Sequence, residues 1–198
     1  VPRGPNESTR KLEILISEIK KLGGLDRVIF LRVEPPVEES DEDKKILRAL
    51  GFKETKPVQP QTTVILNLKN SEKELYEKID KDTRYAIRTA LKRGVEVLKI
   101  ESPEKKLEKF DEFWEIFEET NQRHSLRAYP KKYYREVFLL SGSCRSKIFL
   151  ARVGERTVGA ALIIHFAESA VYNLAASRVS YGKFNAPSLI LWQAILDA

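Results

Sequence analysis

The chain has 198 residues, with 35 Lys and Arg against 29 Asp and Glu, so its formal net charge is +6. Hydrophobic residues make up 42% of it, which excludes a disordered protein, and a chain of this length can bury a substantial core. The longest apolar runs, such as 160–164 and 189–192, are too short to cross a bilayer. A single cysteine excludes an internal disulfide and fits a reducing cytoplasm. Residues 1–5 lack the apolar segment of a signal peptide. Methionine is absent, so we expect that N-terminal residues have been lost.

The first part of the chain predicts helices alternating with strands. Apolar residues recur at helical spacing over 8–22. The β-branched runs 27–33 and 62–68 predict two buried strands, and a pair of prolines stops the first. Between them, Ser40 is expected to cap a short helix that runs through Leu50.

One long helix is predicted to follow, and then a third strand. Ser71 and Glu74 have the spacing of a capping box, which marks a helix start. Apolar residues continue at helical spacing until Gly94, so we expect a single helix up to that point. The run 95–100 is the third strand.

The second half predicts helices and then an antiparallel meander. Ser102 followed by Pro103 has the composition of a helix start, and a shorter helix is expected over 130–140. Short turns separate three strands, and a polar loop leads to a last helix from Pro187. The three strands are 147–153, 157–166 and 170–176.

The order of these elements predicts an α+β (mixed α/β) fold. Helices and strands alternate first, and a run of strands follows. We expect two similar lobes, 1–102 and 103–198, with the boundary near Ser102.

Metal and nucleotide chemistry find little support in the sequence. His124, His165 and Cys144 are too far apart in sequence to form a recognisable ligand motif, so no metal site is predicted. No phosphate-binding loop or dinucleotide fingerprint is present.

Two segments could bind anions. The start of the last helix, with Lys183 and Asn185 just before it, would offer free backbone N–H groups. The segment 81–93 has five bases and one acid, which favours a phosphate-bearing partner or, as the alternative, a solvated helix face. The five bases are Lys81, Arg84, Arg88, Lys92 and Arg93.

Several spaced segments, taken together and in order, resemble the Fem-type (FemABX) aminoacyltransferases. The resemblance covers essentially the whole chain. The matching segments are Pro2-Arg3-Gly4-Pro5, 27–36, 50–52, 59–68, 82–97, Arg123-His124, Tyr133-Tyr134, Gly159, 172–177, 185–187 and Leu191-Trp192.

The resemblance implies twin lobes of the GNAT acyltransferase fold, built from mixed sheets with flanking helices. It implies a cytoplasmic enzyme, in solution or at the inner membrane face, that moves an amino acid from aminoacyl-tRNA to the stem-peptide amine of a UDP-linked or lipid-linked peptidoglycan precursor. No metal or other cofactor is implied. Because the family pattern extends beyond both ends of this sequence, we expect a fragment of a larger protein, which could be inactive alone.

The resemblance also suggests roles for single residues. Glu34 stands where the family has an acid and is a candidate to orient the amine or take its proton; a solvated strand end is the alternative. Tyr172 and Tyr133 match aromatic residues near the precursor, although Tyr172 could equally be core packing. The family arginine expected four residues before Tyr133 is Tyr129 here. Arg123, Arg127, Lys183 and Asn185 complete the predicted substrate-binding set, and the five bases of 81–93 form the predicted tRNA-binding set.

Two other functions remain open. One is a GNAT acyltransferase that uses acyl-CoA or an acyl-carrier protein, although the segment before the last helix has only one glycine, Gly182. The other is a non-catalytic module that binds RNA or protein.

Overall fold

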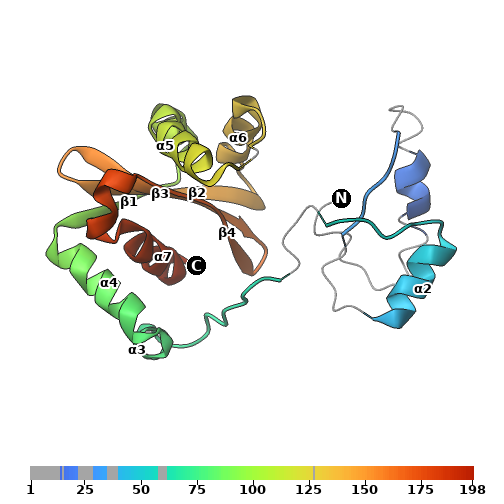
Figure 1. Ribbon diagram of the computed structural model, residues 1–198, viewed down its shortest axis with the longest axis horizontal. Helices are drawn as coiled ribbons and strands as arrows, with labels where there is room; N and C mark the ends of the chain where they lie inside the picture. The colour runs from blue at the N-terminus through green and yellow to red at the C-terminus, as the bar shows by residue number, and fades with distance from the viewer. Residues whose placement is uncertain (1–13, 15, 22–28, 35–39, 58–61, 127) are drawn as a thin grey trace. The chain divides into compact units, whose positions relative to one another are not determined.

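The computed structural model describes residues 14, 16–21, 29–34, 40–57, 62–126 and 128–198. They fall into two compact units, Val1–Leu66 and Asn67–Ala198. Each unit is described by itself below (Figure 1).

In unit 1, the predicted helices are present where the structure describes them. Residues 14 and 16–21 are helical, and Ile16 is fully buried. Helix α2 spans Asp41–Ala49, and the Ser40 hydroxyl accepts a hydrogen bond from the Asp43 amide at 3.1 Å, as the cap prediction requires. Gly51 ends this region with a φ of 85°, a conformation that favours glycine.

The two strands predicted in this region are wrong for the residues described. Residues 29–33 and 62–66 form no strand, and Glu34 makes only an isolated bridge. Ile29 is 96% exposed and Ile65 is 87% exposed, so these apolar side chains are not buried in unit 1. A β-branched run has a local preference for extended backbone, but a strand also needs a neighbour paired with it over several residues. The described part of unit 1 contains no strand.

Unit 2 contains most of the regular structure. Its helices are α3 (Glu72–Lys78), α4 (Lys81–Lys92), α5 (Pro103–His124), α6 (Lys131–Phe138), the 3₁₀ segment η1 (Val179–Phe184) and α7 (Ala186–Asp197). Its strands are β1 (Val95–Ile100), β2 (Cys144–Val153), β3 (Arg156–Phe166) and β4 (Ser169–Ser177).

The single helix predicted from Ser71 to Gly94 is two helices. The capping box at Ser71 is present. However, Ile79 is extended, and the Asp80 carboxylate accepts a hydrogen bond from the Thr83 amide at 2.8 Å, which starts α4 as a new helix. A carboxylate at this position satisfies a free N–H of the following turn. One helix therefore ends and a second begins there, although the apolar spacing is continuous.

The four strands form one antiparallel sheet in the order β1-β2-β3-β4, which confirms the predicted meander. Helices α5 and α6 cover one face of it, and α4 and α7 cover the other (Figure 1). Alternate residues of the strands pack into the two cores: Ile148 and Leu150 face α5, whereas Phe149 and Ala151 face α7. The predicted mixture of helices and strands is therefore confirmed.

The predicted lobe boundary near Ser102 lies inside unit 2. Strand β1 comes before it and pairs with β2, which comes after it, through partners such as Val97 and Ala151. The division into lobes 1–102 and 103–198 stays a prediction.

Candidate functional site

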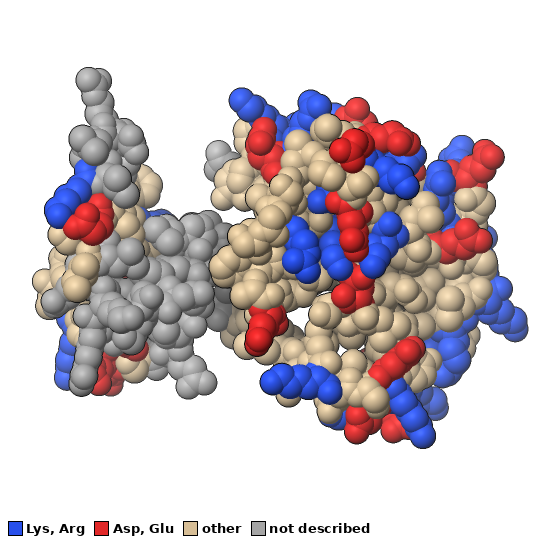
Figure 2. Space-filling view, turned by 180° about the vertical axis from the view of Figure 1, so that it is seen from behind, with Lys and Arg blue, Asp and Glu red and all other residues tan. Residues whose placement is uncertain are grey.

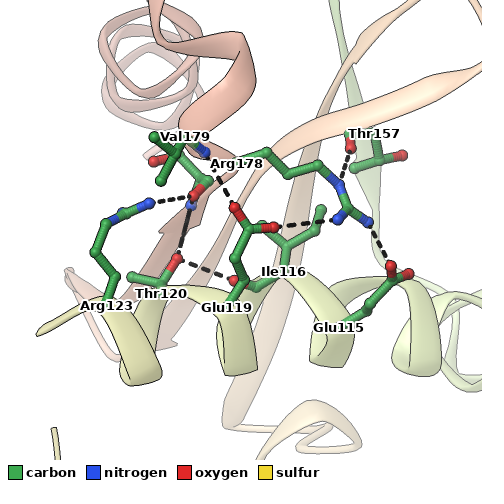
Figure 3. A network of polar contacts seen from close by, with 9 residues as sticks. Glu115, Ile116, Glu119, Thr120, Arg123, Thr157, Arg178 and Val179 are labelled. Atoms are coloured by element: carbon green, nitrogen blue, oxygen red, sulfur yellow. Dashed lines mark hydrogen bonds and ion pairs between the residues drawn. The ribbon is translucent and has the colours of Figure 1, made fainter. Parts of the chain in front are cut away.

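The segment between β4 and α7 is fastened to helix α5 by its backbone. The Ser177 amide donates to the Thr120 hydroxyl at 3.1 Å, and the Ser177 carbonyl accepts from the Arg123 guanidinium at 3.1 Å. Next along the chain, the Val179 amide donates to the Glu119 carboxylate at 3.1 Å. These contacts join residues far apart in the sequence and set where η1 begins (Figure 3).

Arg178 completes this attachment with its side chain. Its guanidinium donates to the Thr157 carbonyl at 3.1 Å and to Glu119 at 3.2 Å, and it lies 3.0 Å from a Glu115 carboxylate oxygen (Figure 3). A planar guanidinium with several oxygen partners is held in one orientation. Arg178 therefore locks β3, α5 and the start of η1 together.

A second arginine holds the same segment from the other side. The Arg93 side chain, at the end of α4, donates to the backbone carbonyl of Lys183 in η1. Arg93 was predicted to bind tRNA, which stays a prediction; in the structure its guanidinium fastens the loop before α7. The sequence offers no signal for this contact, because the two residues are 90 positions apart.

The start of α7 was predicted to bind an anion, and this role stays a prediction. Asn185 adopts a left-handed conformation with φ of 54°, and no side chain caps the helix behind it. The Lys183 ammonium lies 5.4 Å from the centre of the Phe184 ring. Both predicted residues thus stand on the segment that Arg178 and Arg93 immobilise.

The other four predicted tRNA-binding bases share one face of α4. Ile87 and Ala90 of this helix are buried, and Lys81, Arg88 and Lys92 are exposed on the opposite side. Arg84 is half-buried and donates to the Glu77 carbonyl at 2.9 Å. The face of unit 2 in Figure 2 has acidic and basic side chains interspersed.

Tyr85 lies in the middle of this basic face and was missed by the sequence analysis. It is 63% exposed, and it stands four residues after Lys81 and three before Arg88. Its spacing from Lys81 and Arg88 could have predicted that it lies on the same helix face. An exposed ring among bases is a suitable stacking surface for a nucleobase.

Tyr172 lies on β4 beside a break in the strand register. It pairs with Ile163, whereas Leu174 pairs with Leu162, so Asn173 forms a bulge. Ile163 belongs to the core with α7, which places Tyr172 on that face of the sheet. The residue is 38% exposed, and burial raises the pKa of the Tyr172 hydroxyl to about 12. The phenol is therefore neutral at physiological pH and can donate a hydrogen bond.

Tyr133 lies on α6, on the opposite side of the sheet from α7. It is half-exposed and packs against Tyr129, with ring centres 4.7 Å apart, and edge-on against Tyr134. The structure therefore does not group Tyr133 with Lys183 and Asn185. Arg127, the other predicted residue of this region, lies outside the described residues.

Glu34 lies in unit 1 and lines a pocket of about 560 Å³. The Arg32 guanidinium is 3.9 Å from the Glu34 carboxylate and also donates to the Lys56 carbonyl at 2.8 Å. The pocket lining combines apolar side chains such as Phe30 and Phe52 with more bases than acids. Such a lining suits a ligand that has both an apolar and an anionic part.

Neither a metal centre nor a membrane span was found in the described part of the chain. No group of three or more His, Cys, Asp and Glu side chains there could hold a metal ion. Among the same residues, no helix has the length and apolar character needed to cross a bilayer.

Comparison with known proteins identifies relatives by sequence and by fold. Residues 47–154 match the model of the FemAB family. A lipid II:glycine glycyltransferase from Staphylococcus haemolyticus (strain JCSC1435) is 26% identical over 158 residues, which cover 74% of this chain and 36% of that relative. The chain thus spans about a third of the length of this relative. The crystal structure of FemX shares the fold, with a TM-score of 0.76 at 16% identity, over 100% of this chain and 68% of FemX.

Proposed function

This chain belongs to the FemAB family, and from that membership we propose that it is part of an aminoacyltransferase. The enzyme would move an amino acid from aminoacyl-tRNA to the stem-peptide amine of a peptidoglycan precursor. The family match over residues 47–154 carries this proposal, because it includes α4, α5, α6 and β2. The lipid II:glycine glycyltransferase supports a lipid-linked precursor as acceptor and glycine as the amino acid to test first.

The reaction requires the protein to position the two substrates and to transfer protons. The neutral amine attacks the carbonyl carbon of the aminoacyl ester, a C–N bond forms and the C–O bond to the ribose breaks. The ribose oxygen leaves with the electron pair and gains a proton, while the amine nitrogen loses one. Because the ester is already activated, orientation of the two substrates and stabilisation of the developing oxyanion supply most of the acceleration.

We assign the donor tRNA to the basic face of α4. Lys81, Arg88 and Lys92 supply sequence-independent phosphate contacts, and Tyr85 offers a stacking surface between them. Arg93 belongs to this assignment only indirectly, because it connects α4 to η1.

We propose that Glu34 acts as the general base and accepts the proton that the amine loses. Its carboxylate lines a pocket with bases and apolar side chains, a suitable setting for an amine on a partly anionic precursor. Replacement by glutamine keeps the size of the side chain and removes the base. Glu34→Gln is therefore expected to lower kcat by about 100-fold, and Glu42→Gln on the exposed surface of α2 is the matched control.

A transfer assay with the full-length protein tests the proposal. Lipid II is incubated with glycyl-tRNA or with glycyl-CoA, and the mass of the product is followed. Addition of one glycine from the tRNA alone is expected. Transfer from the thioester instead would indicate a GNAT enzyme of the acyl-CoA type, and no transfer from either donor would favour the non-catalytic alternative.

A further inference from the structure

Unit 2 has a basic pocket that none of the assignments above uses. It has a volume of about 400 Å³ and lies between the N-terminal half of α5 and helix α6. Three of its lining residues are bases of α6, one is an acid of α5, and two are apolar. The lining consists of Leu107, Phe110, Asp111, Lys131, Lys132 and Arg135.

The one acid of this lining is already paired. The Lys131 ammonium lies 2.7 Å from the Asp111 carboxylate. Lys131 and, from farther away, Arg135 lower the pKa of Asp111, so this carboxylate is ionised at physiological pH. It therefore neutralises one of the three bases and leaves the pocket with an excess of positive charge.

The other two bases, Lys132 and Arg135, account for that excess. Both are exposed on α6, and within the described part of the chain neither side chain makes a hydrogen bond or an ion pair. Residues three apart on a helix are neighbours on its surface, so both can contact one ligand. Glu136, the acid next to them on α6, is not part of the lining. Two adjacent donors of this kind suit an anion with several acceptor oxygens, such as a phosphate.

The apolar part of the lining favours a lipid over an RNA as the source of the phosphate. Leu107 is 40% exposed, and it offers an apolar contact beside the bases. An RNA would instead need an exposed ring on which a base could stack. Phe110 is buried, and the Lys131 ammonium lies 5.6 Å from its ring centre and 5.8 Å from that of Trp114. The pocket therefore suits the headgroup of an anionic phospholipid.

We propose that this pocket docks the protein on a membrane by binding the phosphate of an anionic phospholipid through Lys132 and Arg135. Helices α5 and α6 cover one face of the sheet and α4 the other, so a membrane at α6 leaves the basic face of α4 open to the aqueous phase (Figure 1). The ligand is the bulk lipid and not the precursor. That docking brings the enzyme to a lipid-linked acceptor rests on the proposed function, whereas lipid binding rests on the pocket alone.

Vesicle binding by the full chain tests the proposal in the absence of any precursor. The protein should sediment with vesicles that contain phosphatidylglycerol and not with vesicles of phosphatidylcholine alone. Lys132→Gln combined with Arg135→Gln should weaken this binding about 30-fold, since each base near an anionic lipid surface contributes a factor of about five. Neither side chain has a partner among the described residues, so the variant should melt at the temperature of the wild type.

Arg88→Gln combined with Lys92→Gln on α4 is the matched control, because it removes the same charge from the other side of the sheet. This control should bind vesicles as the wild type does. Equal weakening by both pairs would mean that net charge is responsible, and the proposal would be wrong.

Three further results would also overturn it: wild-type protein that binds both kinds of vesicle equally, an α6 pair that loses tRNA binding and keeps vesicle binding, or free glycerol phosphate bound as tightly as the vesicles. The transfer assay is a separate readout. Vesicle binding that depends on Lys132 and Arg135, without glycine transfer, would refute the proposed function alone.

Discussion

At the scale of single residues, Arg178 and His165 differ in how their surroundings treat a positive charge. The Arg178 guanidinium reaches three oxygen partners on β3 and α5, and its side chain is 22% exposed. His165 is buried on β3, and its Nε2 lies 4.0 Å from the Asp197 carboxylate without a hydrogen bond. Arg178 stabilises the fold through its charge, whereas burial disfavours the charged form of His165.

Arg178→Ala is expected to lower the free energy of unfolding by about 1–2 kcal/mol, because it removes charge-assisted hydrogen bonds at the start of η1. Arg178→Lys should lose less, since an ammonium can keep one of the carboxylate contacts. Urea denaturation measures both variants. Arg156→Ala at the exposed start of β3 is the control, and equal losses in Arg178→Ala and this control would contradict the anchoring role.

His165 is expected to make the protein less stable in mild acid. Burial lowers the pKa of His165 from its ordinary value of 6.5, with help from Lys147 and Arg145 and against Asp197 and Glu101. The unfolded chain therefore gains a proton at this residue at a higher pH than the folded protein does. Stability should fall as the pH drops below 6.5, by at most about 1.4 kcal/mol per pH unit from this group.

Denaturant unfolding at pH 7 and pH 5 measures this effect. His165→Gln should reduce the difference between the two values. His124→Gln, which removes the other, exposed histidine, should leave it as in the wild type. An unchanged difference in His165→Gln would show that other groups cause the pH dependence.

At the scale of elements, the close approach of α7 to β3 positions the candidate anion site. Gly159 of β3 has no side chain, and a Cβ added there would lie 3.1 Å from Ile190 Cδ1 and 3.4 Å from the Ala186 Cβ. The first turn of α7 therefore packs directly on the strand. The arginine contacts at η1 then decide how the chain enters this turn.

Gly159→Val should force α7 away from the sheet and cost about 1–3 kcal/mol of stability, because an enlarged side chain overpacks the contact. Thermal unfolding followed by circular dichroism measures the loss. Gly182→Val in η1 is the control, since a Cβ there would meet no atom within 4 Å. A loss of similar size in both variants would mean that the α7 contact does not account for the effect.

At the scale of the whole molecule, the net charge of +6 indicates little until the positions of the charged residues on the surface are known. Lys81, Arg88 and Lys92 are exposed on one face of α4. The surface of unit 2 in Figure 2 shows acidic and basic side chains interspersed. A local basic face of this kind would bind a polyanion without requiring a strongly basic protein.

Charge reversal on this face tests it in the full chain. Arg88→Glu combined with Lys92→Glu should weaken tRNA binding and reduce the slope of log affinity against log salt by about 2, because two phosphate contacts are lost. Lys105→Glu combined with Arg156→Glu makes the same change in net charge at exposed positions elsewhere. If both pairs weaken binding equally, net charge and not the α4 face is responsible.

Much of the fold was predictable because its signals are local. The caps at Ser40, Ser71 and Ser102 depend on hydrogen bonds within three residues, and the hairpin turns of the meander are equally short-range. The concentration of bases over 81–93 was likewise visible as a local charge count. Asp80 shows the limit of this approach, since one side-chain contact divided a segment whose apolar spacing was continuous.

The sequence by itself determined which segments are helices, where most of them begin, and which family the chain resembles. Tertiary structure decided whether an apolar run becomes a strand, because a strand requires a paired neighbour. The run 95–100 pairs with β2, whereas 29–33 forms no strand. It also decided which polar groups meet. The contacts of Arg178 with Glu119 and of Arg93 with Lys183 both join segments that are distant in sequence. These contacts form only when the helices pack on the sheet. The spacing of residues along the chain therefore cannot predict them.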